Sequence, residues 1–400
     1  MPGEDRPLAA DFEEVYRIGS LAGDEWETFG QIGGTAFDAA GNLYVFDRQG
    51  NRITMVDREG GFVREIGQAG EGPGEFRIAV QFTVMRDGRL VVADMGHRSY
   101  QLFDADGEFE RMVSMGDGGG MIRGGDLAPH PDGDAVISGG GGTMIRMSGG
   151  PGGSGGPPSE PDTRPIDLVS LTGDEVSTRV IAEGWQPPRG EPTDIEGGGF
   201  QFRMSSAGPR TFEPALLVGA LPDGGVIFSD SSAYALKVVA PEGGVTGILR
   251  RPFHPEPVTE AIEEAERERR LTDLEAGGAP QMRIMVGGRG GAPQPLGQDQ
   301  MRQIMENQIA QLQFFHELPV VTGLQTSWTG KVWVQRRGEE PAVPGPIDVL
   351  TTSGQYMGTF AAGVTEIPSS FGPDGMAAYI ERDEFDVPSV VVRRLPPVLN

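Results

Sequence analysis

A turn glycine followed by a short apolar run recurs along the whole chain, and this repeat limits the fold more than any other feature. The first copies are 47 and 45 residues apart, and their runs read NLYVFD, RLVVAD and DAVISG. The six inner-turn glycines are Gly41, Gly88, Gly133, Gly224, Gly330 and Gly375. In three copies a second turn glycine follows 19 residues later, at Gly60, Gly107 and Gly243. This pattern indicates units of short antiparallel strands, A to D, joined by tight turns.

One four-stranded sheet cannot bury both of its faces alone, so repeats of this length stack radially. The sequence therefore predicts a single all-β domain, a six-bladed β-propeller. The 91 residues from Gly133 to Gly224 equal about two periods, which leaves seven blades as an alternative. That stretch contains no second turn-glycine signature, which favours six.

The sixth unit ends one strand short, and FEEVYRIGS near the N-terminus resembles a fourth strand without partners. We infer that residues 14–19 complete the last sheet, which closes the ring and removes exposed sheet edges. The predicted domain spans 12–397. Its blades are expected at 35–67, 82–116, 126–183, 215–250, 319–362 and 369–396, the last together with strand 14–19.

The longest connections are expected on one face of the ring. In an antiparallel A–B–C–D sheet, the A–B and C–D turns share a turn face, whereas B–C loops and D–A connections share the other. Segments 139–163, 184–215, 251–317 and 337–346 all belong to that second, loop-rich face. The Gly/Pro/Ser-rich insert 139–163 is expected to be flexible. Because loops on rigid scaffolds carry function, we expect the binding site on the loop-rich face.

Residues 257–316, between blades 4 and 5, are expected to form a helical insertion. The segment VTEAIEEAERERRLTDLEA is rich in helix formers, and Asp299 is expected to cap a second helix. An apolar stripe at helical spacing consists of Met301, Ile304, Met305, Ile309, Leu312 and Phe315. The stripe is interpreted as packing against the propeller or the first helix; the alternative is a lid or a partner-docking helix.

Composition excludes several classes of protein. The net charge is -25, with 58 acidic and 33 basic residues, so polyphosphates are repelled and nucleic acid is not expected as a partner. The chain has no cysteine, which excludes disulfides and thiolate metal sites. No apolar run is long enough to span a membrane. The N-terminus lacks signal-peptide character, so the chain is either cytoplasmic or a mature form without its leader. A monomer is expected.

Six residues after each inner-turn glycine, strand B meets the loop-rich face. These positions hold Asp47, Asp94, Gly139, Asp230, Arg336 and Glu381, expected as a ring around the channel mouth. The carboxylates could pair with strand-C arginines (Arg52, Arg98), hold Ca²⁺, or contact a substrate. The candidate ligand-binding residues are therefore Asp47, Arg52, Asp94, His97, Arg98, Asp230, Arg336 and Glu381. The candidate metal ligands are Asp47, Asp94, Asp230 and Glu381.

The runs NLYVFDRQGNRITMVD and RLVVADMGHRSYQLFD place an aspartate and then Asn-Arg or His-Arg between two strands. This arrangement resembles NHL repeats, and residues 12–397 are similar to bacterial six-bladed β-propeller proteins of the NHL type. Relatives include binding modules, lactonase-like hydrolases, and a zinc- and calcium-dependent lyase. The resemblance implies an exported protein, periplasmic or extracellular. Blades 3 and 5 depart from the pattern, so no site is expected in every repeat.

Two main functions remain open. The leading hypothesis is a non-enzymatic scaffold that binds a protein, peptide, glycan or small molecule on the loop-rich face, because no nucleophile–base pair is assembled. The alternative is a metal-dependent hydrolase or lyase with Ca²⁺ or Zn²⁺ at the channel mouth. Its metal could be held by the four carboxylates, or by His97, His254 and His316. His130 precedes an inner turn and is expected on the opposite face. A purely structural role is a third possibility.

Overall fold

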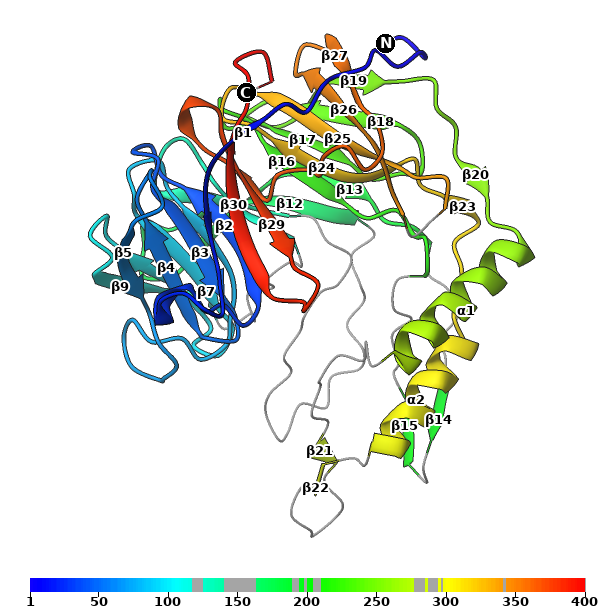
Figure 1. Cartoon of the computed structure of the whole chain (residues 1–400), viewed down its shortest axis with the longest axis horizontal. Helices are drawn as coiled ribbons and strands as arrows, with labels where there is room; N and C mark the ends of the chain where they lie inside the picture. The colour runs from blue at the N-terminus through cyan, green and yellow to red at the C-terminus, as the bar shows by residue number, and fades with distance from the viewer. Residues whose placement is uncertain are drawn as a thin grey trace.

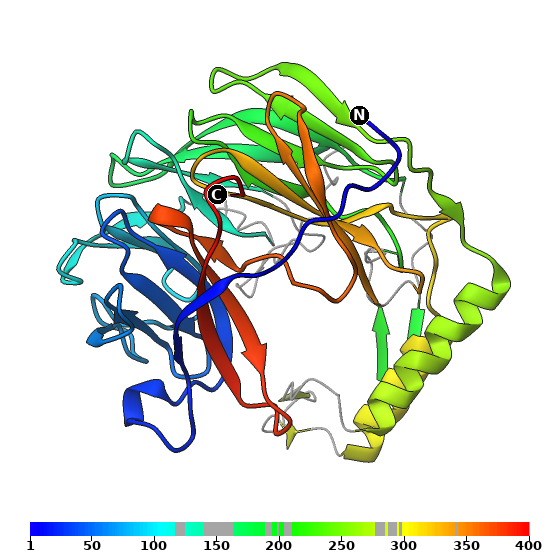
Figure 2. The same ribbon diagram turned by 45° about the horizontal axis from the view of Figure 1, so that its top comes forward.

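In the computed structural model, the described residues are 1–116, 125–139, 163–188, 194–197, 200–203, 210–276, 285–286, 294–295, 298–340 and 343–399. Within them, six four-stranded antiparallel sheets stand radially around a central axis (Figure 1, Figure 2). The predicted six-bladed β-propeller is confirmed. The long spacing before the fourth unit comes from connecting segments and not from a seventh blade.

The first three blades follow one another along the chain. Blade 1 contains β2 (Ile32–Phe37), β3 (Leu43–Asp47), β4 (Arg52–Val56) and β5 (Phe62–Ile66). Blade 2 contains β6 (Ala79–Val84), β7 (Leu90–Asp94), β8 (Ser99–Phe103) and β9 (Phe109–Ser114). Blade 3 contains β10 (Leu127–Pro129), β11 (Ala135–Ser138), β12 (Thr163–Ser170) and β13 (Ser177–Trp185). Between β11 and β12, residues 140–162 of the insert predicted to be flexible lie outside the described residues.

The other three blades complete the ring. Blade 4 contains β16 (Leu217–Ala220), β17 (Val226–Ser229), β18 (Ala235–Val239) and β19 (Val245–Arg250). Blade 5 contains β24 (Val321–Thr326), β25 (Lys331–Arg337), β26 (Pro344–Thr351) and β27 (Tyr356–Phe360). Blade 6 contains β28 (Ser370–Phe371), β29 (Met376–Arg382), β30 (Pro388–Arg394) and β1 (Glu13–Ile18).

The inner-turn glycines explain why each unit reverses tightly between its first two strands. All six have φ between 78° and 90°, the left-handed region that glycine enters without steric cost. In five of these turns the glycine amide donates to the carbonyl three residues earlier, as Gly224 does to Leu221 at 3.0 Å. The repeat in the sequence is therefore a repeat of backbone conformation.

The predicted N-terminal closure is also confirmed. Strand β1 pairs antiparallel with β30, from Glu13 opposite Arg394 to Ile18 opposite Val390. The first strand thus becomes the outermost strand of the last blade (Figure 2). Both chain ends are held in one sheet, so blade 6 does not depend on its short β28 alone.

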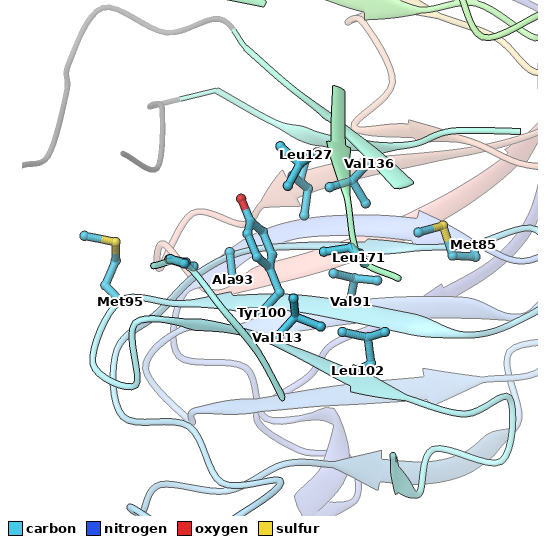
Figure 3. Packing of buried hydrophobic residues seen from close by; sticks show 12 residues of the cluster. Met85, Val91, Ala93, Met95, Tyr100, Leu102, Val113, Leu127, Val136 and Leu171 are labelled. Atoms are coloured by element: carbon cyan, nitrogen blue, oxygen red, sulfur yellow. The ribbon is translucent and has the colours of Figure 1, made fainter. Parts of the chain in front are cut away.

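Apolar side chains fill the space between every pair of neighbouring blades. Six buried clusters occur among the described residues, one at each of the six interfaces. Figure 3 shows the interface of blades 2 and 3, where Val91, Tyr100 and Leu102 face Val136 and Leu171. The core is therefore a ring of six apolar layers around a central channel.

The helical insertion lies between β19 and β24, as predicted. It contains β20 (Glu256–Pro257), α1 (Glu260–Glu275), β21 (Met285–Val286), β22 (Gln294–Pro295), α2 (Gln298–Ala310) and β23 (Glu317–Leu318). The preceding insertion adds the hairpin of β14 (Asp194–Gly197) and β15 (Phe200–Arg203), which packs against α2. Asp299 lies inside the first turn of α2, so the predicted N-cap is wrong by at least one residue.

The insertion between blades 3 and 4 and the insertion between blades 4 and 5 contact each other close to the blades, around the ring of Phe315. Thr211 exchanges main-chain hydrogen bonds with the segment after α2, accepting from the Phe315 amide at 2.8 Å. The Phe315 ring meets Trp185 edge-on, and the Arg210 guanidinium lies 4.8 Å from its centroid. The apolar residues on one side of α2, from Met301 to Ile309, are half-buried. This burial agrees with the predicted packing of the helix against neighbouring elements. Figure 1 shows the two helices projecting to one side of the blades.

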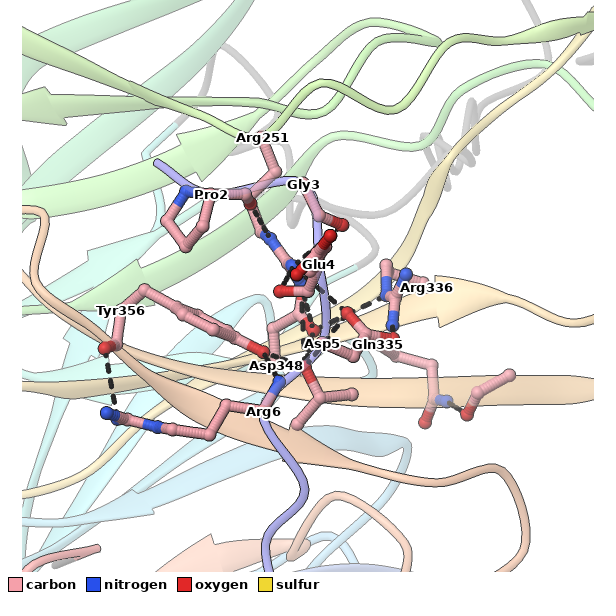
Figure 4. A network of polar contacts seen from close by, with 12 residues as sticks. Pro2, Gly3, Glu4, Asp5, Arg6, Arg251, Gln335, Arg336, Asp348 and Tyr356 are labelled. Carbon is pink, nitrogen blue, oxygen red and sulfur yellow. Dashed lines mark hydrogen bonds and ion pairs between the residues drawn. The ribbon is translucent and has the colours of Figure 1, made fainter.

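Residues 1–10 form an N-terminal strap that sequence reasoning did not anticipate. Figure 4 shows the strap crossing blades 4 and 5, where Arg251 donates to Asp5 at 3.0 Å and to Asp348 at 2.8 Å. Arg336 donates to the other oxygen of Asp5 at 2.5 Å. Arg251 and Asp348 are completely buried side chains. The main chain of residues 6–8 then pairs with Thr359 of β27, so the strap ties blade 4 to blade 5 before reaching blade 6.

Candidate ligand-binding channel

The described residues enclose a central channel with a volume of about 910 Å³. It is lined by the innermost strands of the six blades, which pair with a neighbour on one side only. Main-chain N–H and C=O groups along the other edge are therefore directed toward the axis. A channel of this size accommodates a small molecule or a short peptide, and its walls offer many hydrogen-bonding groups.

Uncharged polar side chains line the middle of the channel. Thr35 of β2 lies 2.6 Å from the Ser370 hydroxyl of β28, and the Gln325 side chain donates to the Ser369 carbonyl at 3.3 Å. Gln81 of β6 donates to the main chain of the segment that enters blade 3. These contacts connect the innermost strands of neighbouring blades, and they add hydrogen-bonded polar groups to a lining that is otherwise largely apolar.

A cation–π pair crosses the channel at the turn face. The Arg86 guanidinium, from the A–B turn of blade 2, lies 4.8 Å from the centroid of a Trp328 ring. Trp328 belongs to the A–B turn of blade 5, and blades 2 and 5 are opposite each other in a ring of six. His130 lines the same end, as predicted for the turn face. The pair therefore spans the channel at its turn-face end.

Charged side chains surround the mouth at the loop-rich face. Arg48, which follows β3, donates to the Val80 carbonyl at 2.9 Å, and Gly33 leaves the space that its side chain occupies. Asp126, which precedes β10, lines the same mouth. The surrounding protein raises the pKa of Asp126, and the positive charge of Arg48 opposes this shift. Glu366, before β28, is the third charged residue in this part of the lining.

The predicted site residue Asp94 has a structural environment. It is fully buried and accepts hydrogen bonds from the amides of Arg77 and Ile78 at 2.9 and 3.0 Å, and from those of Gly96 and His97 at 2.8 and 3.2 Å. The His97 ring contacts it through Nδ1 at 2.9 Å. Burial alone would raise the pKa of Asp94, but these hydrogen bonds lower it below its ordinary value. Asp94 thus joins the entry of blade 2 to its B–C loop.

Asp47 has the same role in blade 1. Its carboxylate accepts from the amides of Gly30, Gln31 and Gln49 at 3.0 to 3.1 Å. Arg52, the predicted ion-pair partner, lies 3.9 Å away and donates to a main-chain carbonyl of the preceding segment. In blade 1 the strand-C arginine therefore lies beside the aspartate, as that interpretation expects, and the amides make the shorter contacts.

The third predicted aspartate, Asp230, connects blade 4 to blade 3 in a similar way. Asp230 is buried and accepts from the Trp185 amide at 2.7 Å and from Lys237 at 2.6 Å. Its cationic partner is a strand-C lysine and not an arginine. Arg98, expected to pair in blade 2, instead donates to the Gly116 carbonyl at 3.0 Å.

The two other charged strand-end residues, Glu381 and Arg336, are held by ion pairs. Glu381 contacts Arg17 at 2.8 Å and Arg393 at 2.5 Å, which links β29 to β1 and β30. Burial alone would raise the pKa of Glu381, but the two arginines lower it. Arg336 binds Asp5 of the N-terminal strap. Both residues therefore fasten the closure of the ring.

None of the eight predicted ligand-binding residues lies among those that line the channel. The expected ring at the channel mouth is therefore not formed, because these side chains turn toward amides and counter-charges within and between the blades. The structure does not bring together Asp47, Asp94, Asp230 and Glu381. Across the described part of the chain, no three His, Asp or Glu side chains are grouped as a metal site would require. This finding covers His97, His254 and His316 as well.

The residues that do line the mouth gave no signal in the sequence. Arg48 follows the predicted Asp47, and Asp126 and Glu366 each precede an innermost strand. The innermost strands β10 and β28 have only three and two residues, too few for an alternating pattern. The expected ring consists of residues from the end of strand B in each blade. Candidates taken from the start of strand A would have included this part of the channel mouth.

Comparisons with known proteins support the class of fold. Residues 27–115, which include blades 1 and 2, match the model of a family described as "DUF5128: 6-bladed beta-propeller". A putative exported protein from Bacteroides fragilis is similar with a TM-score of 0.50 and 10% identity, covering 99% of this chain and 100% of that chain. A member of the duf4221 family from Bacteroides vulgatus gives a TM-score of 0.52 and 10% identity, covering 96% and 98%.

At this identity the similarity shows the fold alone. The comparison with curated proteins finds no match. The fold and its channel therefore define a six-bladed β-propeller. Among the described helices, none has both the length and the apolar character needed to cross a membrane.

Proposed function

We propose that this chain is a non-enzymatic binding propeller that receives its ligand, or a segment of a partner, at the mouth of the channel on the loop-rich face. The channel carries this proposal: it is large, its lining combines apolar with polar side chains, and Arg86 and Trp328 span it at the opposite end. We further propose that the chain acts as a monomer and that its repeats are of the NHL type.

The predicted strand-end residues are proposed to support this site without lining it. Asp47 and Asp94 each hold an entering strand and a B–C loop together through main-chain amides. Arg48 follows Asp47 directly, so the position of a mouth residue depends on that carboxylate. A rigid rim lowers the entropy cost of ordering loops when a ligand binds.

A blocked channel tests the proposal. Thr322 of β24 is exposed at the mouth, and Thr322→Trp is expected to obstruct entry; Thr246→Trp, on the exposed outer strand β19, is the matched control. Ligands found by thermal-shift screening of small molecules, peptides and glycans should lose binding to the first variant and retain it with the second. Equal binding to both variants, or turnover by the wild type in a hydrolase and lyase panel, would contradict the proposal.

The alternative, a metal-dependent hydrolase or lyase using Ca²⁺ or Zn²⁺, needs ligands other than the four carboxylates first considered. Those carboxylates already accept hydrogen bonds or ion pairs from their own blades. Elemental analysis of the purified protein, with melting curves with and without EDTA, separates the two functions. Stoichiometric metal and a lower melting temperature in EDTA would favour the enzyme.

We also propose that the protein works in the periplasm or outside the cell. The support is the NHL-type resemblance together with the similarity to the Bacteroides fragilis protein, which is described as a putative exported protein. Cell fractionation of the native host tests this location. Recovery in the cytoplasmic fraction alone would contradict it.

A further inference from the structure

We infer that the channel mouth binds a ligand carrying protonated amino groups, with Asp126 as its main contact and Glu366 as a second. This inference rests on the proposed binding function and names the chemical class of the ligand. It depends on the position of Asp126, the charges around it, and the charge of the whole molecule.

Asp126 is placed to meet a ligand inside the channel. The residue is exposed, and its side chain lines the channel. Among the described residues, no hydrogen bond or ion pair reaches its carboxylate, in contrast to Asp94 with its four amides. The surroundings disfavour the charged form and raise its pKa, so a cationic partner would gain from restoring the charge.

Glu366 extends the acidic surface across the mouth. It precedes β28 of blade 6, whereas Asp126 precedes β10 of blade 3, and these blades are opposite each other in the ring. Arg48 is the only cation at this mouth among the described lining residues, and its guanidinium is already bonded to Val80. The described lining of this mouth is therefore net acidic, and we expect a ligand with two separated ammonium groups to contact both carboxylates.

The charge of the whole protein favours the same class of ligand. A net charge of -25 attracts cations toward the protein and repels anions. Surface attraction of this kind is weak and screened by salt, whereas a pair inside a partly desolvated channel is screened much less. Salt dependence therefore separates binding in the channel from adsorption on the surface.

The experiment uses probes of one chain length and different end groups. Calorimetric titrations at pH 8 in 150 mM salt compare cadaverine, pentylamine, 1,5-pentanediol and glutarate. We expect cadaverine to bind at one saturable site, with the diol and glutarate at least about tenfold weaker. Asp126→Asn should raise the Kd of cadaverine at least about tenfold, while Glu366→Gln should weaken cadaverine more than pentylamine.

Two further variants make the test specific. Asp106→Asn removes one charge from an exposed C–D turn on the opposite face and should leave the Kd unchanged. Arg48→Gln removes the cation at the mouth and should tighten cadaverine binding. A melting temperature close to that of the wild type shows that each variant is folded.

The outcomes separate this inference from the proposed function. Equal cadaverine binding by wild type and Asp126→Asn would overturn the inference, as would a diol or glutarate that binds as tightly as cadaverine. If cadaverine does not bind but another ligand is blocked by Thr322→Trp, the amine class is wrong and the binding propeller stands. If no screened ligand is blocked by Thr322→Trp, the proposed function fails.

Discussion

Replacing Asp94 with alanine should destabilise the propeller, because this carboxylate organises four main-chain amides at the edge of blade 2. A hydrogen bond to a charged group contributes about 1.5–3 kcal/mol, and removing one partner from a buried charged network costs about 3–5 kcal/mol. We therefore expect Asp94→Ala to lose about 4 kcal/mol of unfolding free energy.

Thermal unfolding followed by circular dichroism measures this loss. Unfolding entropy is about 2.1 cal/mol/K per residue, which gives roughly 0.8 kcal/mol/K for a chain of 400 residues. A loss of about 4 kcal/mol should therefore lower Tm by about 5 °C. Glu381→Ala is the matched control, since it occupies the equivalent strand end but makes partly exposed ion pairs with Arg17 and Arg393. Such pairs contribute about 0–1 kcal/mol, so its Tm should fall by about 1 °C.

The pH dependence gives a second measurement on the same variants. The folded pKa of Asp94 is lowered, so its stabilisation is complete above the unfolded value of about 3.9 and is lost as pH falls through the folded value. The difference in Tm between wild type and Asp94→Ala should therefore be constant near neutral pH and shrink below about pH 4. The reasoning would be refuted if the Tm of Asp94→Ala at pH 7 lay within 1 °C of the wild-type Tm, or if it fell by no more than the Tm of the Glu381→Ala control.

Two further predictions concern the turns and the strap. Gly224→Ala should lower the unfolding free energy by about 2 kcal/mol or more, and Gly244→Ala should lower it by about 1 kcal/mol. Both glycines have φ of 90°, so alanine is strained at either position. At Gly224, however, the added Cβ would also lie 2.6 Å from Nε2 of His130, whereas at Gly244 it would meet no atom within 4 Å. Urea titrations check the difference, and equal losses would show that the contact does not matter. Arg251→Met should lower the unfolding free energy by about 3–5 kcal/mol, because it leaves the buried carboxylate of Asp348 without its main counter-charge. A loss below about 1 kcal/mol in the same urea titration would contradict this expectation.

The sequence predicted most of the fold because its signals are local. A left-handed turn needs glycine in each unit, so the repeat of Gly41, Gly88 and their equivalents reports backbone conformation directly. The apolar strands between them report burial, and the unpaired strand at 14–19 indicated closure. The loop-rich face followed from counting strands, without any tertiary information.

The candidate site was much harder to predict because its contacts are not local. The position of Asp94 could be read from the repeat, but its partners are main-chain amides, which no residue type reveals. Arg251 and Asp348 meet only when blades 4 and 5 are side by side under the strap. Asp126 carries no motif at all, and only the channel geometry distinguishes it from the other acidic residues.

The pairing of β1 with β30 has a consequence for biosynthesis. The ribosome makes β1 before every other strand of the six blades and makes its partner β30 after all of them, so the ring stays open until the last blade has been made. During that time the apolar layer between blades 6 and 1 lacks the side chains of β29 and β30, which exposes a surface prone to aggregation. Contacts so distant in sequence also slow folding, so the pairing of β30 with β1 should be the step that commits the propeller to its native state.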